Sequence, residues 1–270
     1  MVVYPLLTLA LHLSNSVTGL HEILETFQPI TLGEMKGVEL MDRDDTKFVV
    51  PVEAILEILP GLVSDYRVLE VEGNRASTYE TVYYDTSDFF FYTRHHNGKM
   101  NRMKIRKRRY VESNLNFLEV KFKTNREKTL KDRTRLPEIR DDLNTSELHF
   151  IDEETHFGRE LEPKIWNFFT RVTLVSQVLR ERITIDFSLS FRNASGERYA
   201  LRRLAIVEVK QPRRSRLSPM MAALHKRHIR PESMSKYCLG VANLYPNVKK
   251  NAFKPKLRRI ASLETYDQLH

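Results

Sequence analysis

The sequence has a single cysteine, Cys238, and no hydrophobic run long enough to cross a membrane. One cysteine excludes an internal disulfide framework and a cysteine-rich zinc site. The most apolar stretch, residues 2–13, is interrupted by Pro5, Thr8 and His12. It is also shorter than the roughly 20 residues that a spanning helix needs. We therefore expect a cytoplasmic protein without a membrane span.

Basic residues are absent from the start of the chain, and linker sequences are absent throughout. No lysine or arginine precedes Lys36, so the positively charged beginning of a secretory signal is missing. No repeat, low-complexity block or Gly/Ser/Pro-rich linker divides the chain. The sequence therefore predicts one domain over residues 27–245, with an N-terminal extension at 1–26 and a basic C-terminal tail at 246–270.

The charge balance favours an anionic partner. Lysine and arginine total 44 against 35 aspartates and glutamates, which gives a net charge of +9. Such a surplus attracts nucleic acid, phosphate or an acidic surface without distinguishing among them. The hydrophobic fraction of 41% indicates a folded chain with a sizeable core rather than a disordered one.

Alternating apolar and polar residues predict a fold dominated by strands. We expect strands at 43–50, 78–85, 103–111, 117–123, 168–176, 182–191 and 202–210. Helical spacing predicts helices at 52–59, 160–167, 219–228 and 233–244, while the charged stretch 124–157 is typical of loops. His95 and His96, followed by Asn97 and Gly98, predict a hairpin turn. The sum is an antiparallel α+β domain.

Several predicted strands carry rows of cations on one face. Lys104, Arg106 and Arg108 alternate along one strand, and Lys121 and Lys123 along the next. Two cations about 7 Å apart repel by roughly 2 kcal/mol at an effective dielectric near 20, so adjacent rows need something anionic between them. A closed barrel with helices outside and a cationic lumen would satisfy both faces of such strands. A thin phosphate chain fits that lumen, and double-stranded nucleic acid does not.

Eight segments in order give the chain a family resemblance. It resembles the polyphosphate polymerase domain of the vacuolar transporter chaperone (VTC) family, a branch of the CYTH-like triphosphate tunnel enzymes, in its stand-alone bacterial form. The segments are MDRDDTKFVVP at 41–51, TVYYDTSDFFFY at 81–92, MKIRKRRY at 103–110, FLEVKFK at 117–123, FFTRVTL at 168–174, RITIDFSLSF at 182–191, AIVEVKQ at 205–211 and SKYCLGV at 235–241.

The resemblance implies both a fold and an activity. The implied fold is an α+β, eight-stranded antiparallel β-tunnel with helices packed outside. The implied activity is metal-dependent phosphoryl transfer on nucleoside triphosphate or polyphosphate, with Mn²⁺ or Mg²⁺ beside the phosphates, in the direction of polyphosphate synthesis from ATP. Hydrolysis of triphosphate and non-catalytic polyphosphate binding are the alternatives. No nucleic-acid partner is expected, because the cationic rows carry aromatic residues only at their ends, at Tyr110 and Phe117.

The resemblance also assigns roles to individual residues. The implied catalytic residues are Lys47, Arg106, Arg108, Lys121, Arg171, Arg182 and Lys236. The further substrate-binding residues are Arg43, Lys104, Lys123 and Lys210, and the implied metal ligand is Glu208. Arginine presents a planar fork to phosphate oxygens and lysine a compact charge, while a carboxylate suits a hard divalent cation.

Each assignment has a structural alternative. Four of the cations could pair with Asp45 and Glu119 on an ordinary polar face, namely Lys47, Arg106, Arg108 and Lys121. Glu208 could be the counter-ion of Lys210 or Arg202.

Three further assignments are less determined. Asp186 could be a second metal ligand or a residue that orients an arginine, and Lys236 could cap a surface helix. The paired carboxylates typical of the wider superfamily at its first strand are only partly present, since Asp45 alone holds a matching position.

Overall fold

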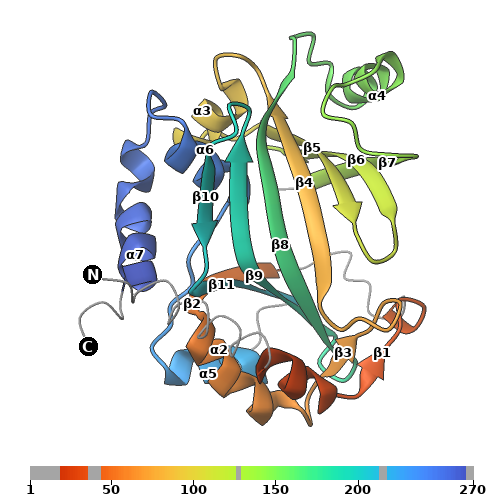
Figure 1. The fold of residues 1–270 in the computed structure, drawn as a ribbon, viewed down its shortest axis with the longest axis vertical. Helices are drawn as coiled ribbons and strands as arrows, with labels where there is room; N and C mark the ends of the chain where they lie inside the picture. The colour runs from red at the N-terminus through yellow and green to blue at the C-terminus, as the bar shows by residue number, and fades with distance from the viewer. Residues whose placement is uncertain (1–18, 36–43, 126–128, 213–217, 266–270) are drawn as a thin grey trace, which may run out of the picture. The chain divides into compact units, whose positions relative to one another are not determined.

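The protein is described here by a computed structural model covering residues 19–35, 44–125, 129–212 and 218–265 (Figure 1). The chain forms two compact units. Unit 1 contains the residues up to Ser77 together with 170–188 and 202–234, and unit 2 contains 78–169, 189–201 and the residues from Ser235 onward. Two long strands, β8 (Glu162–Ser176) and β9 (Glu181–Asn193), contribute to both units.

Unit 1 is a sheet with helices on one face. Strand β11 (Leu204–Gln211) pairs antiparallel with β2 (Asp44–Pro51) on one side and with β9 on the other. The short strand β3 (Arg67–Leu69) pairs with β8, and β1 (Pro29–Ile30) pairs with β3. The helices are α2 (Val52–Ile58), the 3-10 turn η2 (Leu59–Leu62) and α5 (Pro219–Lys226), and Figure 1 shows α2 and α5 side by side beneath the strands.

Strand alternation sets the core of unit 1. Phe48, Ile185 and Val207 point to the helix-covered face and are almost completely buried. Residues 19–25 are helical, and Leu24 packs into the same core. Successive side chains of a strand point to opposite faces, so the other face of β2, β11 and β9 receives the intervening polar residues.

Unit 2 is built on an antiparallel run of strands with helices on both faces. The strands β4 (Ser77–Asp85), β5 (Arg102–Tyr110), β6 (Leu115–Lys123) and β7 (Thr129–Leu136) pair in that order, and β10 (Arg198–Leu201) pairs with β9. Its helices are α3 (Phe90–His96), α4 (Thr145–Thr155), α6 (Lys236–Leu244), the 3-10 turn η3 (Asn251–Phe253) and α7 (Lys254–Thr265). No helix in the described ranges is long and apolar enough to cross a membrane.

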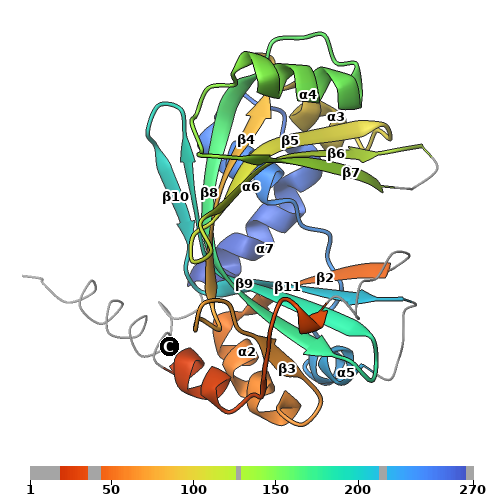
Figure 2. The ribbon, with the colours of Figure 1, turned by 90° about the vertical axis from the view of Figure 1, so that its right-hand side faces the viewer.

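Helix α4 covers one face of β5, β6 and β7 (Figure 2). Ile105, Leu118 and Ile151 belong to the apolar cluster on this face. Lys107 is buried on the same face, where its Nζ lies 2.9 Å from a carboxylate oxygen of Glu147 and donates to two backbone carbonyl oxygens. The face that α4 covers therefore excludes solvent even at Lys107, because this lysine is paired within the layer.

The predicted α+β class with antiparallel strands is confirmed. Eight strands pair in the order β2-β11-β9-β8-β4-β5-β6-β7. β1, β3 and β10 pair outside this path, so the sheet has eleven strands in the described ranges. All seven predicted strands are present, and so are the predicted helices that correspond to α2, α5 and α6.

Three local predictions are wrong. The helix expected at 160–167 is the start of β8, where Pro163 lacks the amide that a helix interior requires. The stretch expected to form loops contains β7 and α4, and α4 begins with a capping box between Asn144 and Glu147. His95 and His96 end α3 rather than forming a hairpin turn.

Gly240 of α6 should not tolerate a side chain. A Cβ atom at this position would lie 2.9 Å from both Ile165 and Phe191, so α6 can approach these strands only with glycine there. We expect Gly240→Ala to lower the free energy of unfolding by about 1–3 kcal/mol, as overpacking does, measured by urea denaturation. Gly158→Ala is the control, since a Cβ there has no neighbour within 4 Å. Equal stability of both variants would contradict this account of the α6 contact.

Candidate functional site

Strands β5, β6 and β7 present a row of cations on the face opposite α4. The register places Arg106 opposite Glu119, and Glu119 opposite Arg133. The same face of the three strands carries nine cations and one carboxylate, Glu119. The nine cations, which we call the β5 face, are Arg102, Lys104, Arg106, Arg108, Lys121, Lys123, Lys131, Arg133 and Arg135.

Glu119 lies among the guanidinium groups of this face. Arg106 Nε donates to Glu119 Oε2 at 2.5 Å, and Arg108 Nη1 lies 4.0 Å from the same oxygen. Burial would raise the pKa of Glu119, but the charges of Arg106 and Arg108 outweigh burial and lower it below its usual value. Glu119 is therefore ionised at neutral pH and neutralises part of the row.

Aromatic rings form the floor beneath the two arginines. The guanidinium carbon of Arg106 lies 5.9 Å from the ring centroid of Tyr83, and that of Arg108 lies 5.5 Å from the ring of Tyr79. Arg108 Nε also donates to Thr81 Oγ1 at 3.2 Å. Burial would raise the pKa of the Tyr83 phenol, but Arg106 and Arg108 lower it below its usual value. The positive charge around the Tyr83 hydroxyl therefore outweighs the effect of its burial.

The first turn of α6 adds polar groups to the β5 face. Lys104 Nζ donates to Ser235 Oγ at 3.0 Å, and Ser235 Oγ in turn accepts from the backbone N–H of Cys238. Lys236 Nζ lies 4.3 Å from the ring centroid of Phe169. Ser235 rather than Lys236 caps the helix, so capping does not account for Lys236.

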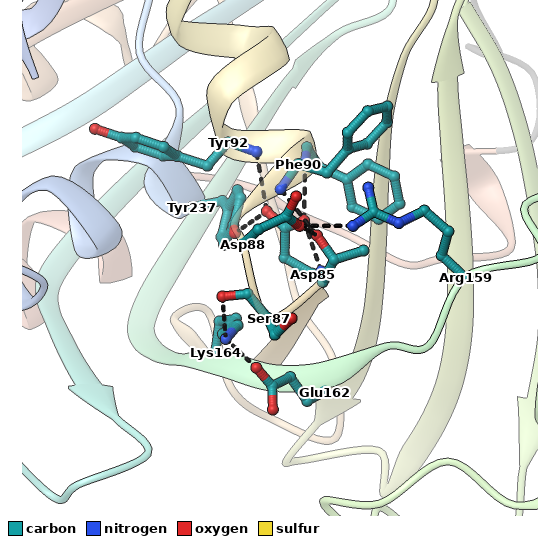
Figure 3. A network of polar contacts seen from close by, with 11 residues as sticks. Asp85, Ser87, Asp88, Phe90, Tyr92, Arg159, Glu162, Lys164 and Tyr237 are labelled. Carbon is teal, nitrogen blue, oxygen red and sulfur yellow. Dashed lines mark hydrogen bonds and ion pairs between the residues drawn. The ribbon is translucent and has the colours of Figure 1, made fainter. Parts of the chain in front are cut away.

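Asp85 fixes α6 and α3 relative to β4 (Figure 3). Its carboxylate accepts from the backbone N–H of Tyr92 at 2.9 Å and from the hydroxyl of Tyr237 at 2.5 Å. Burial raises the pKa of Asp85, although these donors act in the opposite direction. Tyr237 follows Lys236 directly, so the same contact that anchors α6 also positions the lysine.

Unit 1 carries a second set of charges on the face of β2, β11 and β9 that lies opposite its helices. Glu208 lies opposite Lys47 in the register and forms an ion pair with it. Its other oxygen lies 2.6 Å from Lys210 Nζ, which also donates to Thr184 Oγ1 at 3.2 Å. We call Lys47, Arg171, Arg182, Glu208 and Lys210 the β11 cluster.

Burial and pairing act against each other in this cluster. Burial would raise the pKa of Glu208, but Lys210 and Lys47 hold it well below its usual range. Burial lowers the pKa of Lys210 to about 8, although Glu208 acts in the opposite direction. Glu208 is thus ionised at neutral pH, whereas the pKa of Lys210 lies close to physiological pH.

Arg171 and Arg182 belong to the same face. Arg171 binds Asp186 through two hydrogen bonds of 2.5 and 2.8 Å, so Asp186 orients an arginine in this structure. Arg182 lies opposite Lys210 in the register of β9 and β11. Glu208 is the counter-ion of Lys210 and Lys47 together, which extends the structural alternative raised from the sequence.

The donor set suits a divalent cation only in part. In the described ranges, no group of three or more His, Cys, Asp or Glu side chains could hold a metal ion. Glu208 is ionised and therefore fits as one oxygen ligand, but a lysine already contacts each of its oxygens. Because Mg²⁺ and Mn²⁺ are commonly held by one or two carboxylates plus substrate phosphates, the residues fit a metal that arrives with phosphate.

The structure places the predicted site residues in two sets, one in each unit. Unit 2 brings together Lys104, Arg106, Arg108, Lys121, Lys123 and Lys236. Unit 1 brings together Lys47, Arg171, Arg182, Lys210 and Glu208. Arg43 lies outside the described residues. A shared cavity for both sets stays a prediction.

Sequence reasoning missed the three cations of β7. Lys131, Arg133 and Arg135 alternate and extend the β5 face by one strand. The guanidinium carbon of Arg133 lies 4.7 Å from the ring centroid of Phe117. The alternation of basic residues in this stretch was the available signal. It was missed because the residues between them, such as Asp132 and Thr134, do not form an apolar face.

The β5 face suits a long polyanion better than a single small anion. Forked and point-like donors alternate along extended strands, so charge-assisted hydrogen bonds are available at regular intervals. Only one carboxylate competes for these donors on β5, β6 and β7.

Comparisons with known proteins give one family match. The model described as "VTC domain" matches residues 42–245. No curated protein shows significant similarity to the chain. Among solved structures, a Pyrococcus horikoshii protein is similar at 15% identity over 74% of this chain and 99% of that chain, with a TM-score of 0.43. HpAC1 from Hippeastrum, described as having a dominant triphosphatase activity, is similar at 13% identity over 76% and 98%, with a TM-score of 0.45.

Proposed function

Because the chain belongs to the VTC domain family, we propose that it is an enzyme of metal-dependent phosphoryl transfer on nucleoside triphosphate or polyphosphate. We propose further that it synthesises polyphosphate from ATP, so that the γ-phosphoryl group passes to the terminal oxygen of a phosphate chain and ADP leaves. The observation that carries the proposal is the β5 face, where nine cations on three strands surround a single carboxylate.

The proposed roles follow from the contacts of each residue. Arg106 and Arg108 bind neighbouring phosphates, with Lys104, Lys121, Lys123 and Lys236 as further phosphate ligands. In the β11 cluster, Lys47, Arg171, Arg182 and Lys210 bind phosphate, and Glu208 would hold Mn²⁺ or Mg²⁺ when phosphate is bound. The metal would neutralise charge on the phosphate oxygens. Phosphoryl transfer depends mainly on positioning and charge stabilisation, which these residues supply.

The direction of reaction is tested by the products. The protein is incubated with ATP and Mn²⁺, and separately with short-chain polyphosphate and Mn²⁺, and the products are separated by anion-exchange chromatography. Synthesis predicts chains longer than triphosphate together with ADP. Inorganic phosphate without longer chains would show a hydrolase, and binding without turnover would show a non-catalytic module.

Loss of either arginine of the β5 face should weaken triphosphate binding. We expect Arg106→Ala and Arg108→Ala each to lower the affinity about tenfold or more, because one charge-assisted contact is lost. Arg106→Lys should recover only part of the loss, since lysine cannot form the bidentate fork. The measurement is calorimetry with triphosphate on variants whose folding is checked by thermal melting.

Arg109→Ala is the matched control for this pair. Arg109 lies on the same strand but on the other face, where it contacts Glu80 at 3.7 Å. Its removal changes the net charge equally and should leave the affinity within about twofold, the scale of a surface charge effect. If all three alanine variants bind alike, the β5 face is not the phosphate site.

Glu208→Gln should separate metal binding from phosphate binding. Without metal, we expect the variant to keep triphosphate binding largely intact, because the amide releases Lys47 and Lys210 for phosphate while loss of the Glu208 charge favours the neutral form of Lys210. With triphosphate present, its affinity for Mn²⁺ should fall about tenfold or more, since one charged ligand is lost. Both affinities are measured by calorimetry. An unchanged Mn²⁺ affinity would contradict the assignment of Glu208.

Triphosphate binding should be coupled to proton uptake above pH 8. Free Lys210 has a pKa of about 8 and loses its charge as the pH rises through that value, so binding must restore the proton. The affinity should therefore decrease with rising pH. Calorimetry at pH 8.5 in buffers of different ionisation enthalpy measures the uptake. Lys210→Met should take up fewer protons than the parent, with the remainder assigned to Lys104, whose pKa burial also lowers. Equal uptake by both proteins would contradict a phosphate contact of Lys210.

A further inference from the structure

A buried carboxylate in unit 1 lies at the start of β9. Glu181, the first residue of this strand, is 0% exposed. It accepts hydrogen bonds from the hydroxyl of Tyr66 at 2.5 Å, from the hydroxyl of Ser218 at 2.9 Å and from the side-chain amide of Gln211 at 2.5 Å. The donors lie just before β3, at the start of α5 and at the end of β11. One carboxylate therefore joins four separate parts of unit 1.

The neighbouring hydrogen bonds show which way the two hydroxyl protons point. Ser218 Oγ accepts from the backbone N–H of Met221 at 3.1 Å, and Tyr66 Oη accepts from that of Met220 at 3.4 Å. Each hydroxyl therefore directs its own proton at Glu181, which acts as the acceptor in these bonds, as an ionised carboxylate does. The donors to Glu181 named above are all uncharged groups.

Stability alone does not account for a carboxylate at this position. Alternation places Glu181 on the same face of β9 as Ile183 and Ile185, which belong to the apolar core of unit 1. Burying an ionisable group costs free energy that an apolar side chain there would not cost. Burial accordingly raises the pKa of Glu181, although its hydrogen bonds act in the opposite direction. The hydrogen bonds of Glu181 therefore indicate a role in fixing geometry.

The hydrogen bond from Gln211 to Glu181 crosses from β11 to β9 beside two cations of the β11 cluster. Arg182 and Lys210 are directly opposed in the register, and Glu181 and Gln211 are the next residues along the two strands. The cations lie on the face opposite the helices, while Glu181 and Gln211 lie on the helix-covered face. Directly opposed like charges destabilise strand pairing. The buried bond therefore joins the strands where repulsion between Arg182 and Lys210 acts to separate them.

We propose that Glu181 is a positioning residue, which through Gln211 fixes the ends of β9 and β11 so that Arg182 and Lys210 contact one bound phosphate chain together. The inference rests on the proposed function, in which both cations bind phosphate. Without the bond between the strands, Arg182 and Lys210 keep their charges, but the spacing between them is no longer fixed. Part of their contact with phosphate is then lost, although neither side chain has been changed.

The first test separates positioning from stability in the full chain. Glu181→Met removes the bond between the strands and should lower the affinity for inorganic triphosphate about tenfold, the scale of one charge-assisted contact. The control is Leu224→Ala, which opens a cavity in the apolar core of the same unit. It should lower the melting temperature and leave the affinity unchanged. Calorimetry measures binding, and thermal melting measures stability. If Glu181→Met does not fold, Gln211→Met removes the same bond and should show the same loss.

A double-mutant cycle adds a readout that a loss of stability would not change. Arg182→Ala should lower the affinity for triphosphate about tenfold in the parent protein. In the Glu181→Met background it should lower the affinity by less, because Arg182 is no longer held at the phosphate. The two substitutions are then non-additive, as expected for residues that act through one contact. Additive losses would contradict the positioning role.

Other results would also overturn the inference. An equal loss of affinity in Leu224→Ala and Glu181→Met would reduce it to an effect of stability. If Arg182→Ala weakens triphosphate binding but Glu181→Met does not, only the positioning role of Glu181 fails. If Arg182→Ala binds as tightly as the parent, the phosphate role of the β11 cluster fails, and the positioning role fails with it. If the parent binds no triphosphate, the proposed function fails as a whole.

Discussion

Two carboxylates, Glu119 and Glu208, allow the cationic faces of the two units to form. Directly opposed residues on neighbouring antiparallel strands have Cβ atoms about 5 Å apart, and like charges at that spacing destabilise a sheet. Glu119 lies between cations of β5 and β7, and Glu208 lies between Lys47 and Lys210. Each carboxylate pairs with the cations beside it and so offsets part of their repulsion in this register. Removing the partner of a buried charge costs about 3–5 kcal/mol, so these pairs are also constraints on which residues can change.

The opposite faces of the same strands supply the rigidity. In unit 1, β2, β11 and β9 pack apolar residues against α2 and α5. In unit 2, α4 covers β5 and β6, and the buried pair of Lys107 and Glu147 closes that layer. Asp85 then holds α6 so that Lys236 and Ser235 lie at the cationic face. The polar faces can concentrate like charge because apolar packing on the other side of the strands offsets the repulsion among the cations.

The alternation of apolar and basic residues was sufficient to predict β5 and β6 and their rows of cations. In these strands one face is largely apolar, so every second residue differs clearly from its neighbours. Alternation was insufficient for β7, where Leu130 is 55% exposed and the intervening positions include Asp132 and Thr134. The pairing of Glu208 was predictable only in part. Lys210 is two residues away and was anticipated as a partner, whereas Lys47 is 161 residues away and meets Glu208 only through the β2–β11 register. Register depends on tertiary packing, which a single sequence does not reveal.

The two carboxylates also shape how phosphate would bind. A cation cluster without internal counter-ions would bind phosphate tightly but would be unstable when empty. With Glu119 and Glu208 in place, an incoming phosphate replaces a contact that already exists, so the arginine and lysine side chains need little rearrangement. The binding free energy is then the difference between a phosphate contact and a carboxylate contact, which is smaller than either alone. Under the proposed function, moderate affinity at each position would let a phosphate chain move along the strands, because no single contact would hold it in place.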